Sequence, residues 1–580
     1  MGHVEGHEVR AHHDADGPDG APGGGQERVT EAGRQVVALA SAPIRPSYAE
    51  ACARFVWRDS LDALGWSDGA DVNLADTIVG RQAGAGPALR WFGKAGAERV
   101  YSFAELTALA ARVAGFLRAA GVEKGDRVAG YLPRVPETLA LMLGAWKAGA
   151  VYVPIFAGFG ADAIAFRVRH SGAKVLGTHH EYRARVPSLP PGVVVMTVGG
   201  GRRAAGEVDF HEAIAAQPER CPSVMRRRDD PAVLLYTSGS TGPPKGVAIA
   251  TNFVLAVHPY MKLGVDLRPD DVFWATGDPG WGYGLVCYMV ALAMGVAVVS
   301  HEATPAAAFV LERLGELGIT NLATTPTLLR GIMALGEAAV RARPPRLRCV
   351  SSCGEPLNAE VVAFFRSVWG LTPMDQYGAS ELGLPIGNFN ALDMMVKPGS
   401  MGLPLPGCRM AIVDDRGTEV APETVGHIGM APSATGYYAL GYWDDPARTR
   451  ELFRGGWMTI GDLARRDADG YFWFEGRADD VIKSAGYRIG PFEVESVILE
   501  HPAVAEAAVV GKPDALRGQI VKAFVVLRTD VVDTPALVDE IVELVKRRVG
   551  RHQYPREVEV VRDLPKTETG KIQRFLLRQR

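Results

Sequence analysis

Apolar and polar positions alternate with helical and strand-like periods along most of the chain. Between positions 102 and 121, apolar residues recur at helical spacing (SFAELTALAARVAGFLRAAG), which predicts an amphipathic helix ending at Gly121. A strand (DRVAGYL), a helix (PETLALMLGAWKAGA) and a buried strand (VYVPIF) are predicted next, and the alternation continues to Leu329 with ITNLATT as a further strand. This order predicts an α/β fold, with a large N-terminal domain of helix-covered mixed sheets.

The pattern changes near Arg477. Beyond it the chain reads as a helix (PFEVESVILEH), two strands (AVAEAAVVG and VKAFVVL) and a second helix (TPALVDEIVELVKRRVG). Together these elements predict a small α+β unit of about one hundred residues, a size that suits a separate domain.

The N-terminal 45 residues differ from the rest because they are rich in Gly, His, Asp and Pro, which predicts a disordered tail. Its histidines (His3, His7, His12 and His13) could bind a metal adventitiously, but a solvated tail is the simpler interpretation. A secretory signal is not expected, because the N-terminus lacks a basic start followed by an apolar stretch. A myristoylation signal is not expected either, because Gly6 stands where such a signal needs Ser or Thr.

One internal stretch, 279–300, carries no charge and is long enough to suggest a membrane span. Its four glycines and the strand-like VAVVS at its end favour a buried helix followed by a strand, so we expect no membrane span.

Composition narrows the classes of function. The length of 580 residues suggests several domains, and a net charge of −3 gives no reason to expect a nucleic-acid partner. The run RRR at 226–228 is followed by two aspartates, which is typical of a solvated surface turn. Six cysteines without CxxC spacing favour reduced thiols, and hence a cytoplasmic protein, over a disulfide framework or zinc site.

The segment YTSGSTGPPKGV (236–247) interrupts an apolar run and predicts a phosphate-binding loop between two strands. Its glycines allow backbone N–H groups to face an anion, its hydroxyls donate hydrogen bonds, and Lys245 adds a positive charge. It is not a Walker A loop because Pro244 precedes the lysine, and a mobile Ser/Gly linker would lack the strand-like flanks. The predicted phosphate contacts are Thr237, Ser238, Gly239, Ser240, Thr241, Gly242 and Lys245.

Four more motifs follow in order: SCGEPLN (352–358), DQYGASE (375–381), the long segment 456–495 that begins GWMTIGDL, and PKTETGK (565–571). With these motifs, the chain from Pro46 onward resembles the adenylate-forming (AMP-binding) superfamily of acyl- and aryl-CoA synthetases, peptide-synthetase adenylation domains and luciferases. The resemblance implies an N-terminal AMP-binding domain (46–478), a hinge at Asp479 and a mobile C-terminal lid domain (479–580).

The resemblance also implies an activity, that of an AMP-forming acyl-CoA synthetase of the acetyl-CoA-synthetase-like branch, a ligase of fatty acid metabolism. In such enzymes a carboxylate attacks the α-phosphate of ATP with Mg²⁺ present, and the resulting acyl-adenylate then reacts with the thiol of coenzyme A. Lys571 matches the family's catalytic lysine, Glu381 the glutamate that holds Mg²⁺, and Thr237 a catalytic residue of the loop. Because acetylation would remove the charge of Lys571, a lysine acetyltransferase or deacetylase is an implied partner.

The remaining nucleotide contacts are carried over from the family motifs. Asp462 matches the acid that accepts both ribose hydroxyls, as the two oxygens of a carboxylate allow. The implied ATP/AMP contacts are Gly354, Glu355, Pro356, Asp375, Gln376, Tyr377, Gly378, Ser380, Asp462, Arg477 and Arg488.

Departures from the family pattern bear on the acyl group. Acetyl-specific members have a bulky tryptophan where this chain has Gly378 and a valine where it has Gly282, so we expect an open pocket that Gly378→Trp would close, although Tyr283 could block the same space from another side. The implied acyl pocket is Trp281, Gly282, Tyr283, Cys353 and Gly378, and the implied CoA contacts are Phe156, Gly158, Arg183, Arg185, Ala485 and Gly486.

We therefore predict short- to medium-chain monocarboxylates as substrates. The alternative is an adenylation enzyme that loads a carrier protein. It is disfavoured because the chain ends nine residues after Lys571 without a carrier domain, and because GWGYG offers no aspartate to neutralise an amino group. A nucleotide-binding module without chemistry is disfavoured because Lys571, Glu381 and Asp462 are all present.

Overall fold

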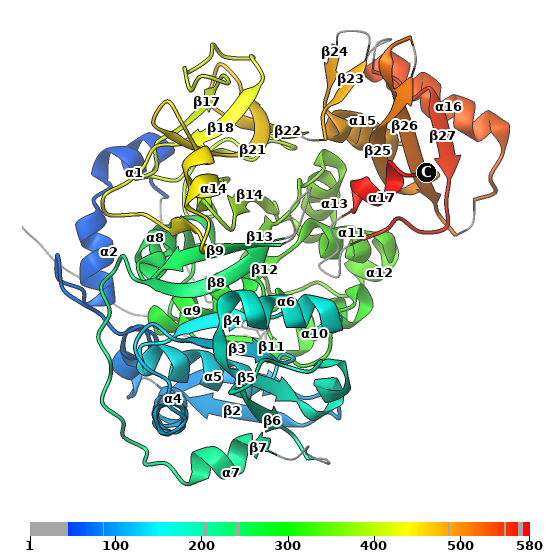
Figure 1. Cartoon of the computed structure of the whole chain (residues 1–580). Coiled ribbons are helices and arrows are strands. Elements are labelled where there is room, and N and C mark those ends of the chain that lie inside the picture. The colour runs from blue at the N-terminus through cyan, green and yellow to red at the C-terminus, as the bar shows by residue number, and fades with distance from the viewer. Residues whose placement is uncertain are drawn as a thin grey trace, which may run out of the picture. The chain divides into compact units, whose positions relative to one another are not determined.

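The computed structural model describes residues 45–84, 86–200, 206–237, 244–478, 480–484, 487–514, 516–529, 531–549, 553–566 and 572–580. The part from Arg45 to the C-terminus forms one compact unit (Figure 1). Its large mixed-sheet region and its smaller α+β region confirm the predicted fold class. The predicted N-terminal tail and hinge residue Asp479 lie outside the described residues, so the domain boundaries stay predictions.

Two large mixed sheets form the N-terminal part. The first has the order β16-β15-β14-β13-β12-β10-β11-β1-β2. Its strands are β1 (Pro87–Phe92), β2 (Glu98–Ser102), β10 (Phe273–Ala275), β11 (Val298–His301), β12 (Asn321–Thr324), β13 (Cys349–Cys353), β14 (Met374–Ala379), β15 (Gly383–Gly387) and β16 (Leu403–Pro404).

The second sheet has the order β19-β9-β8-β4-β3-β5-β6-β7. Its strands are β3 (Arg127–Tyr131), β4 (Val151–Pro154), β5 (Ala173–His179), β6 (Val194–Val198), β7 (Val208–Asp209), β8 (Pro231–Thr237), β9 (Lys245–Ala250) and β19 (Ala439–Tyr442). Strands β3, β4, β5 and β6 pair in parallel and β8 pairs antiparallel with β9, which gives the predicted mixed topology.

A third, antiparallel sheet follows in the chain. It joins β17 (Met410–Val413), β18 (Gly426–Met430), β21 (Trp457–Arg466) and β20 (Phe453–Arg454), and β22 (Phe472–Arg477) pairs with β21.

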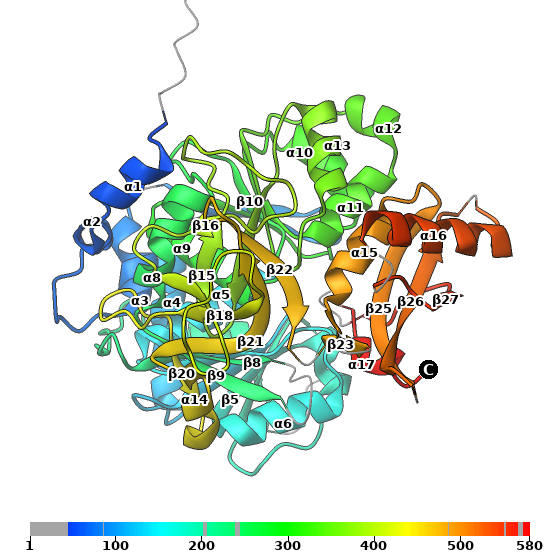
Figure 2. The ribbon, with the colours of Figure 1, turned by 90° about the horizontal axis from the view of Figure 1, so that it is seen from above.

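Several helices pack on the two large sheets and contribute to the core. Helix α4 (Phe103–Ala119) begins with a capping box formed by Ser102 and Glu105 and is followed by Gly121 at φ 81°, close to the predicted end. Helix α5 (Pro136–Lys147) packs on β3 and β4, α9 (Gly282–Ala293) packs on β10 and β11, and α3 (Leu74–Ile78) contacts both helices. Figure 2 shows these four helices, and their apolar side chains belong to one core cluster.

The N-terminal part contains further helical segments. They are α1 (Tyr48–Arg54), α2 (Trp57–Leu64), η1 (Gly80–Gln82), α6 (Ala161–Ser171), η2 (His180–Arg185), α7 (Phe210–Ala215), α8 (Phe253–Pro259), η3 (Tyr260–Gly264), α10 (Ala307–Glu316), α11 (Pro326–Ala334), α12 (Glu337–Arg341), α13 (Ala359–Trp369) and α14 (Pro446–Glu451).

The C-terminal region has its own sheet and core. Strands β24 (Tyr487–Ile489), β23 (Ile482–Ser484), β26 (Gly518–Leu527) and β25 (Val504–Asp514) pair in that order, and β27 (Glu557–Val560) pairs with β26. Helices α15 (Pro491–Leu499) and α16 (Pro535–Arg548) share an apolar cluster with these strands, and α17 (Arg574–Leu577) packs on β25. All four elements predicted from the sequence beyond Arg477 are confirmed.

The charge-free stretch 279–300 folds as α9 followed by β11, as predicted. Among the residues that the structure describes, no helix combines the length and the apolar character needed to cross a bilayer.

Candidate active site

The predicted phosphate loop joins two paired strands. Strands β8 and β9 form an antiparallel hairpin in which Thr237 lies opposite Lys245, so the loop leaves and re-enters the sheet at adjacent positions. This confirms the predicted strand flanks. The loop residues Ser238, Gly239, Ser240, Thr241 and Gly242 lie outside the described residues.

Glu381 and Lys245 both meet an aromatic residue that the sequence did not single out. Strand β19 pairs with β9 and places Tyr442 opposite Val247. The Tyr442 hydroxyl donates a hydrogen bond of 2.9 Å to Oε1 of Glu381, and Nζ of Lys245 lies 5.4 Å from the centre of the tyrosine ring. Tyr442 therefore links the predicted magnesium ligand to the lysine of the phosphate loop.

Glu381 is 9% exposed. Burial raises its pKa, and the hydrogen bond from Tyr442 partly offsets that effect because it stabilises the carboxylate. A buried carboxylate whose hydrogen-bond donors are all neutral can still bind a hard cation through its oxygens, so the residue fits the predicted magnesium role.

Asp462 is held by two neighbours. It lies opposite Arg477 in the β21–β22 pair, and Nη1 of Arg477 donates to Oδ1 of Asp462 at 2.8 Å. The hydroxyl of Tyr377, at the middle of β14, donates to Oδ2 at 2.7 Å. Burial raises the pKa of Tyr377 well above its ordinary value, so its hydroxyl stays a donor. Three residues predicted to contact the nucleoside are thus brought together, and each Asp462 oxygen keeps a lone pair for a ribose hydroxyl.

Glu355 has a structural partner. It accepts hydrogen bonds from the backbone N–H of Thr327 at 3.2 Å and from Nη2 of Arg330 at 2.5 Å, both on α11. Gly354, just before it, has φ 109°, and nothing lies within 4 Å of where a Cβ would stand, so conformation and not space requires glycine there. Pro356 and Ser380 are half-buried.

Asp375 and Gln376 lie in the interior beside this segment. The Asp375 carboxyl accepts hydrogen bonds from the backbone N–H groups of Leu357 at 3.2 Å and Gln376 at 3.0 Å. Burial nevertheless raises the pKa of Asp375 to about 8. Asp375 therefore connects the 354–358 segment to β14.

The implied acyl-pocket residues come from three elements. Trp281 caps α9, with Gly282 and Tyr283 in its first turn, and Cys353 ends β13. A Cβ at Gly282 would meet one leucine methyl group at 3.1 Å. By contrast, a Cβ at Gly378 would lie 2.5 Å from the backbone oxygen of Gly383 and 2.5 Å from Cδ2 of Leu384.

The expectation that Gly378→Trp would close the pocket stays a prediction, but the substitution would not be accommodated without a shift. The neighbouring strand β15 already occupies the space that a side chain at position 378 would enter, so the substitution would force the backbone to move.

Comparisons with known proteins place this arrangement in a family. Residues 79–443 match the family model "AMP-binding enzyme", and residues 493–571 match "AMP-binding enzyme C-terminal domain". The chain belongs to the AMP-binding enzyme family.

Relatives and solved structures agree on the branch. The chain is 37% identical to an acetyl-coenzyme A synthetase of Bacillus subtilis (strain 168), over 92% of this chain and 94% of that protein. It matches the crystal structure of a Brucella canis acyl-CoA synthetase with a TM-score of 0.74 and 39% identity, covering 92% of this chain and 98% of that one. It matches the anthranilate CoA ligase AuaEII, solved with anthranoyl-AMP, with a TM-score of 0.79 and 30% identity, covering 88% and 97%. The predicted superfamily and acyl-CoA synthetase class are confirmed.

Within this AMP-binding enzyme, some implied CoA contacts lie side by side. Arg185, at the end of η2, donates from Nη1 to the backbone oxygen of Ala157 at 3.3 Å, between the implied contacts Phe156 and Gly158. Arg183 is paired with the carboxylate of Glu207, which is only 5% exposed. A phosphate at Arg183 would have to compete with that carboxylate.

The remaining predicted residues fall in the C-terminal region. Lys571, Ala485 and Gly486 lie outside the described residues, and Arg488 lies on β24 opposite Lys483. Described residues on either side of Lys571 form ion pairs, Lys566 with Glu506 at 2.7 Å and Arg574 with the buried Glu495 at 2.7 Å.

Proposed function

We propose that this acyl-CoA synthetase activates short- to medium-chain monocarboxylates with ATP and transfers them to coenzyme A. The observation that carries the proposal is the convergence of Glu381, Tyr442 and Lys245 beside the phosphate loop, together with the Asp462 cluster described above. The first group suits a triphosphate and the second suits a ribose, so the two together support a nucleoside triphosphate as the cosubstrate.

Each group has a defined task in this proposal. Lys245 and the hydroxyl and N–H groups of the loop bind the β- and γ-phosphates, and Asp462 orients the ribose. Lys571 stabilises charge that develops at the α-phosphate as the carboxylate oxygen attacks and pyrophosphate leaves. The thiolate of coenzyme A then attacks the acyl carbon of the adenylate, and AMP departs.

A divalent cation fits at Glu381. Its carboxylate is buried, has one neutral hydroxyl donor and offers the hard oxygen that Mg²⁺ prefers. Mg²⁺ supplies charge neutralisation at the leaving pyrophosphate. Tyr442 orients the carboxylate for that role. We also propose a cytoplasmic location, which the six free cysteine thiols support, and regulation by acetylation of Lys571.

A substrate panel tests the proposal. Pyrophosphate and AMP should be measured with acetate, propionate, butyrate and hexanoate, with and without coenzyme A. Each added methylene should raise kcat/KM about fourfold, since its burial contributes roughly 0.8 kcal/mol, until the pocket ends. A preference for acetate by more than about tenfold would show that Tyr283 closes the pocket. AMP release that coenzyme A does not accelerate would favour the carrier-protein alternative.

A further inference from the structure

A buried chain of hydrogen bonds ends at the implied acyl pocket. Tyr260, in the π-helical turn η3, has its hydroxyl 3.0 Å from the hydroxyl of Tyr283 and also donates to Oε1 of Gln376 on β14. Tyr260 and Gln376 are each 1% exposed, whereas Tyr283 is half-buried. Tyr283 is therefore the least buried of the three residues.

The amide of Gln376 determines which group donates and which accepts in each bond of this chain of hydrogen bonds. Its Nε2 donates to the backbone oxygens of Gly264 at 3.0 Å and Asn388 at 3.3 Å. Because carbonyl oxygens only accept, the amide nitrogen must face them, and the amide oxygen must face Tyr260. That oxygen also only accepts, so the Tyr260 proton is committed to it.

The direction continues to Tyr283. With its own proton used, the Tyr260 oxygen can only accept from the Tyr283 hydroxyl. Tyr283 thus points its proton inward and leaves its oxygen lone pairs for another partner. The thiol of Cys287 lies one turn away on the same helix and is a polar neighbour of Tyr283. Burial raises the pKa of this thiol, so it stays protonated. A thiol is a weak hydrogen-bond partner that a hydroxyl can replace.

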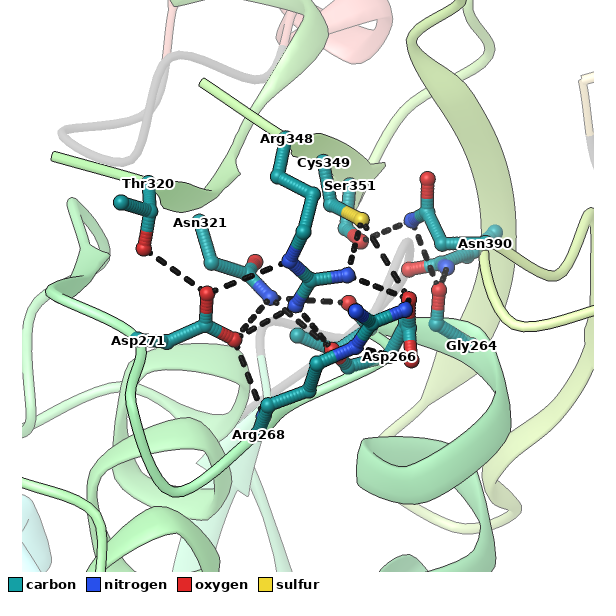
Figure 3. Close-up of polar contacts among 12 residues, drawn as sticks. Gly264, Asp266, Arg268, Asp271, Thr320, Asn321, Arg348, Cys349, Ser351 and Asn390 are labelled. Carbon is teal, nitrogen blue, oxygen red and sulfur yellow. Dashed lines mark hydrogen bonds and ion pairs between the residues drawn. The ribbon is translucent and has the colours of Figure 1, made fainter. Parts of the chain in front are cut away.

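The amide of Gln376 cannot readily turn over, because the Gly264 carbonyl is itself held. Nδ2 of Asn390 donates to that carbonyl at 2.8 Å and to the hydroxyl of Ser351 at 3.0 Å. Two residues further along the chain, Asp266 pairs with Arg348, whose Nη2 lies 2.6 Å from Oδ2 of Asp271 (Figure 3). This network ties the end of η3 to β13, so the acceptor that orients Gln376 stays in place.

We propose that the acyl site prefers carboxylic acids with a hydroxyl donor on the acyl chain, and that the Tyr283 oxygen accepts the hydrogen bond from that hydroxyl. The inference rests on the proposed function and names the substrate class of the same site. Leucine side chains lie next to Gly282 and Gly378, and Tyr283 adds a polar side-chain atom beside them. A carbonyl in the same place gains nothing, because it needs a donor and the Tyr283 proton is already directed to Tyr260.

The test compares kcat/KM for butyrate, its 2-, 3- and 4-hydroxy derivatives and 3-oxobutyrate. One hydroxy acid should exceed butyrate by about threefold to tenfold, as one neutral hydrogen bond allows, and the oxo acid should not. In Tyr283→Phe that ratio should fall to one or below while butyrate is still activated. Tyr48→Phe is the matched control, since its hydroxyl bonds the backbone oxygen of Pro404 at 2.8 Å, and it should keep the wild-type ratio.

Two results would overturn the inference while the proposed function stands. One is activation of butyrate with no hydroxy acid favoured by more than twofold in the wild type, a comparison that needs no variant to fold. The other is a hydroxyl preference that Tyr283→Phe leaves unchanged. Failure to release pyrophosphate with any acid would instead overturn the proposed function and the inference with it.

Discussion

Replacing Tyr442 by phenylalanine would separate the two contacts that this residue makes. The substitution removes the hydroxyl that donates to Glu381 at 2.9 Å but keeps the ring that faces Lys245. The Glu381 carboxylate would then be buried with one donor fewer, in a place where burial already disfavours its charge.

The expected loss follows from these contacts. A hydrogen bond to a charged group contributes about 1.5–3 kcal/mol, so acyl-adenylate formation should fall roughly tenfold to 150-fold in Tyr442→Phe. Tyr442→Leu also removes the ring, and a cation–π contact of about 0.5–1 kcal/mol adds a further twofold to fivefold loss. Because Glu381 is the proposed cation ligand, Tyr442→Phe should also need a higher Mg²⁺ concentration for half-maximal rate.

The assay is ATP–pyrophosphate exchange with butyrate, titrated in Mg²⁺, with thermal unfolding measured on the same samples. Tyr437→Phe, a nearby tyrosine outside the Glu381 contact, is the control and should behave like the wild type. An exchange rate within twofold of the wild type at limiting Mg²⁺ would refute the reasoning. So would a loss of activity that is matched by unfolding at the assay temperature.

Four further predictions concern other parts of the chain. Lys571→Ala should lower acyl-adenylate formation by on the order of a hundredfold while preformed acyl-AMP still reacts with coenzyme A, and equal loss of both half-reactions would contradict its assigned role. Asp479→Pro should impair one half-reaction and spare the other, since it restricts φ at the proposed hinge; a uniform effect would argue against alternation there. Gly284→Ala should lower the stability by about 1–3 kcal/mol because its Cβ would lie 2.1 Å from a backbone oxygen, whereas Gly282→Ala should unfold near the wild-type temperature. Burial raises the pKa of Asp375 to about 8, so the folded protein keeps a proton that the unfolded chain loses near pH 4. The free energy of unfolding should therefore fall by about 1.4 kcal/mol for each unit that the pH rises between these two values. Asp375→Asn should remove this dependence on pH. The measurement is the free energy of unfolding in urea at pH 6 and at pH 8, and an equal difference between variant and wild type at both pH values would show that the pKa is not raised.

Local patterns were sufficient for the elements and for the family. The helix at 103–119 was predictable because its spacing, its Ser102–Glu105 capping box and its terminal glycine all act within a few residues. The same holds for the hairpin around the phosphate loop, where two apolar runs flank a segment that only a loop accommodates. Because each motif is a contiguous segment, the order of the motifs along the chain was enough to indicate the AMP-binding enzyme family.

Tertiary structure alone decided which side chains work together. Tyr442 reaches Glu381 only because β19, far along the chain, pairs with β9, and no local period marks such a pairing. Glu355 belongs to a motif but is already bonded to α11, and the space beside Gly378 is filled by β15. The direction of the hydrogen-bond chain ending at Tyr283 depends on backbone carbonyls of two other segments. Sequence determines local conformation and motif order, whereas packing between distant strands determines which polar groups are satisfied and which stay free for a substrate.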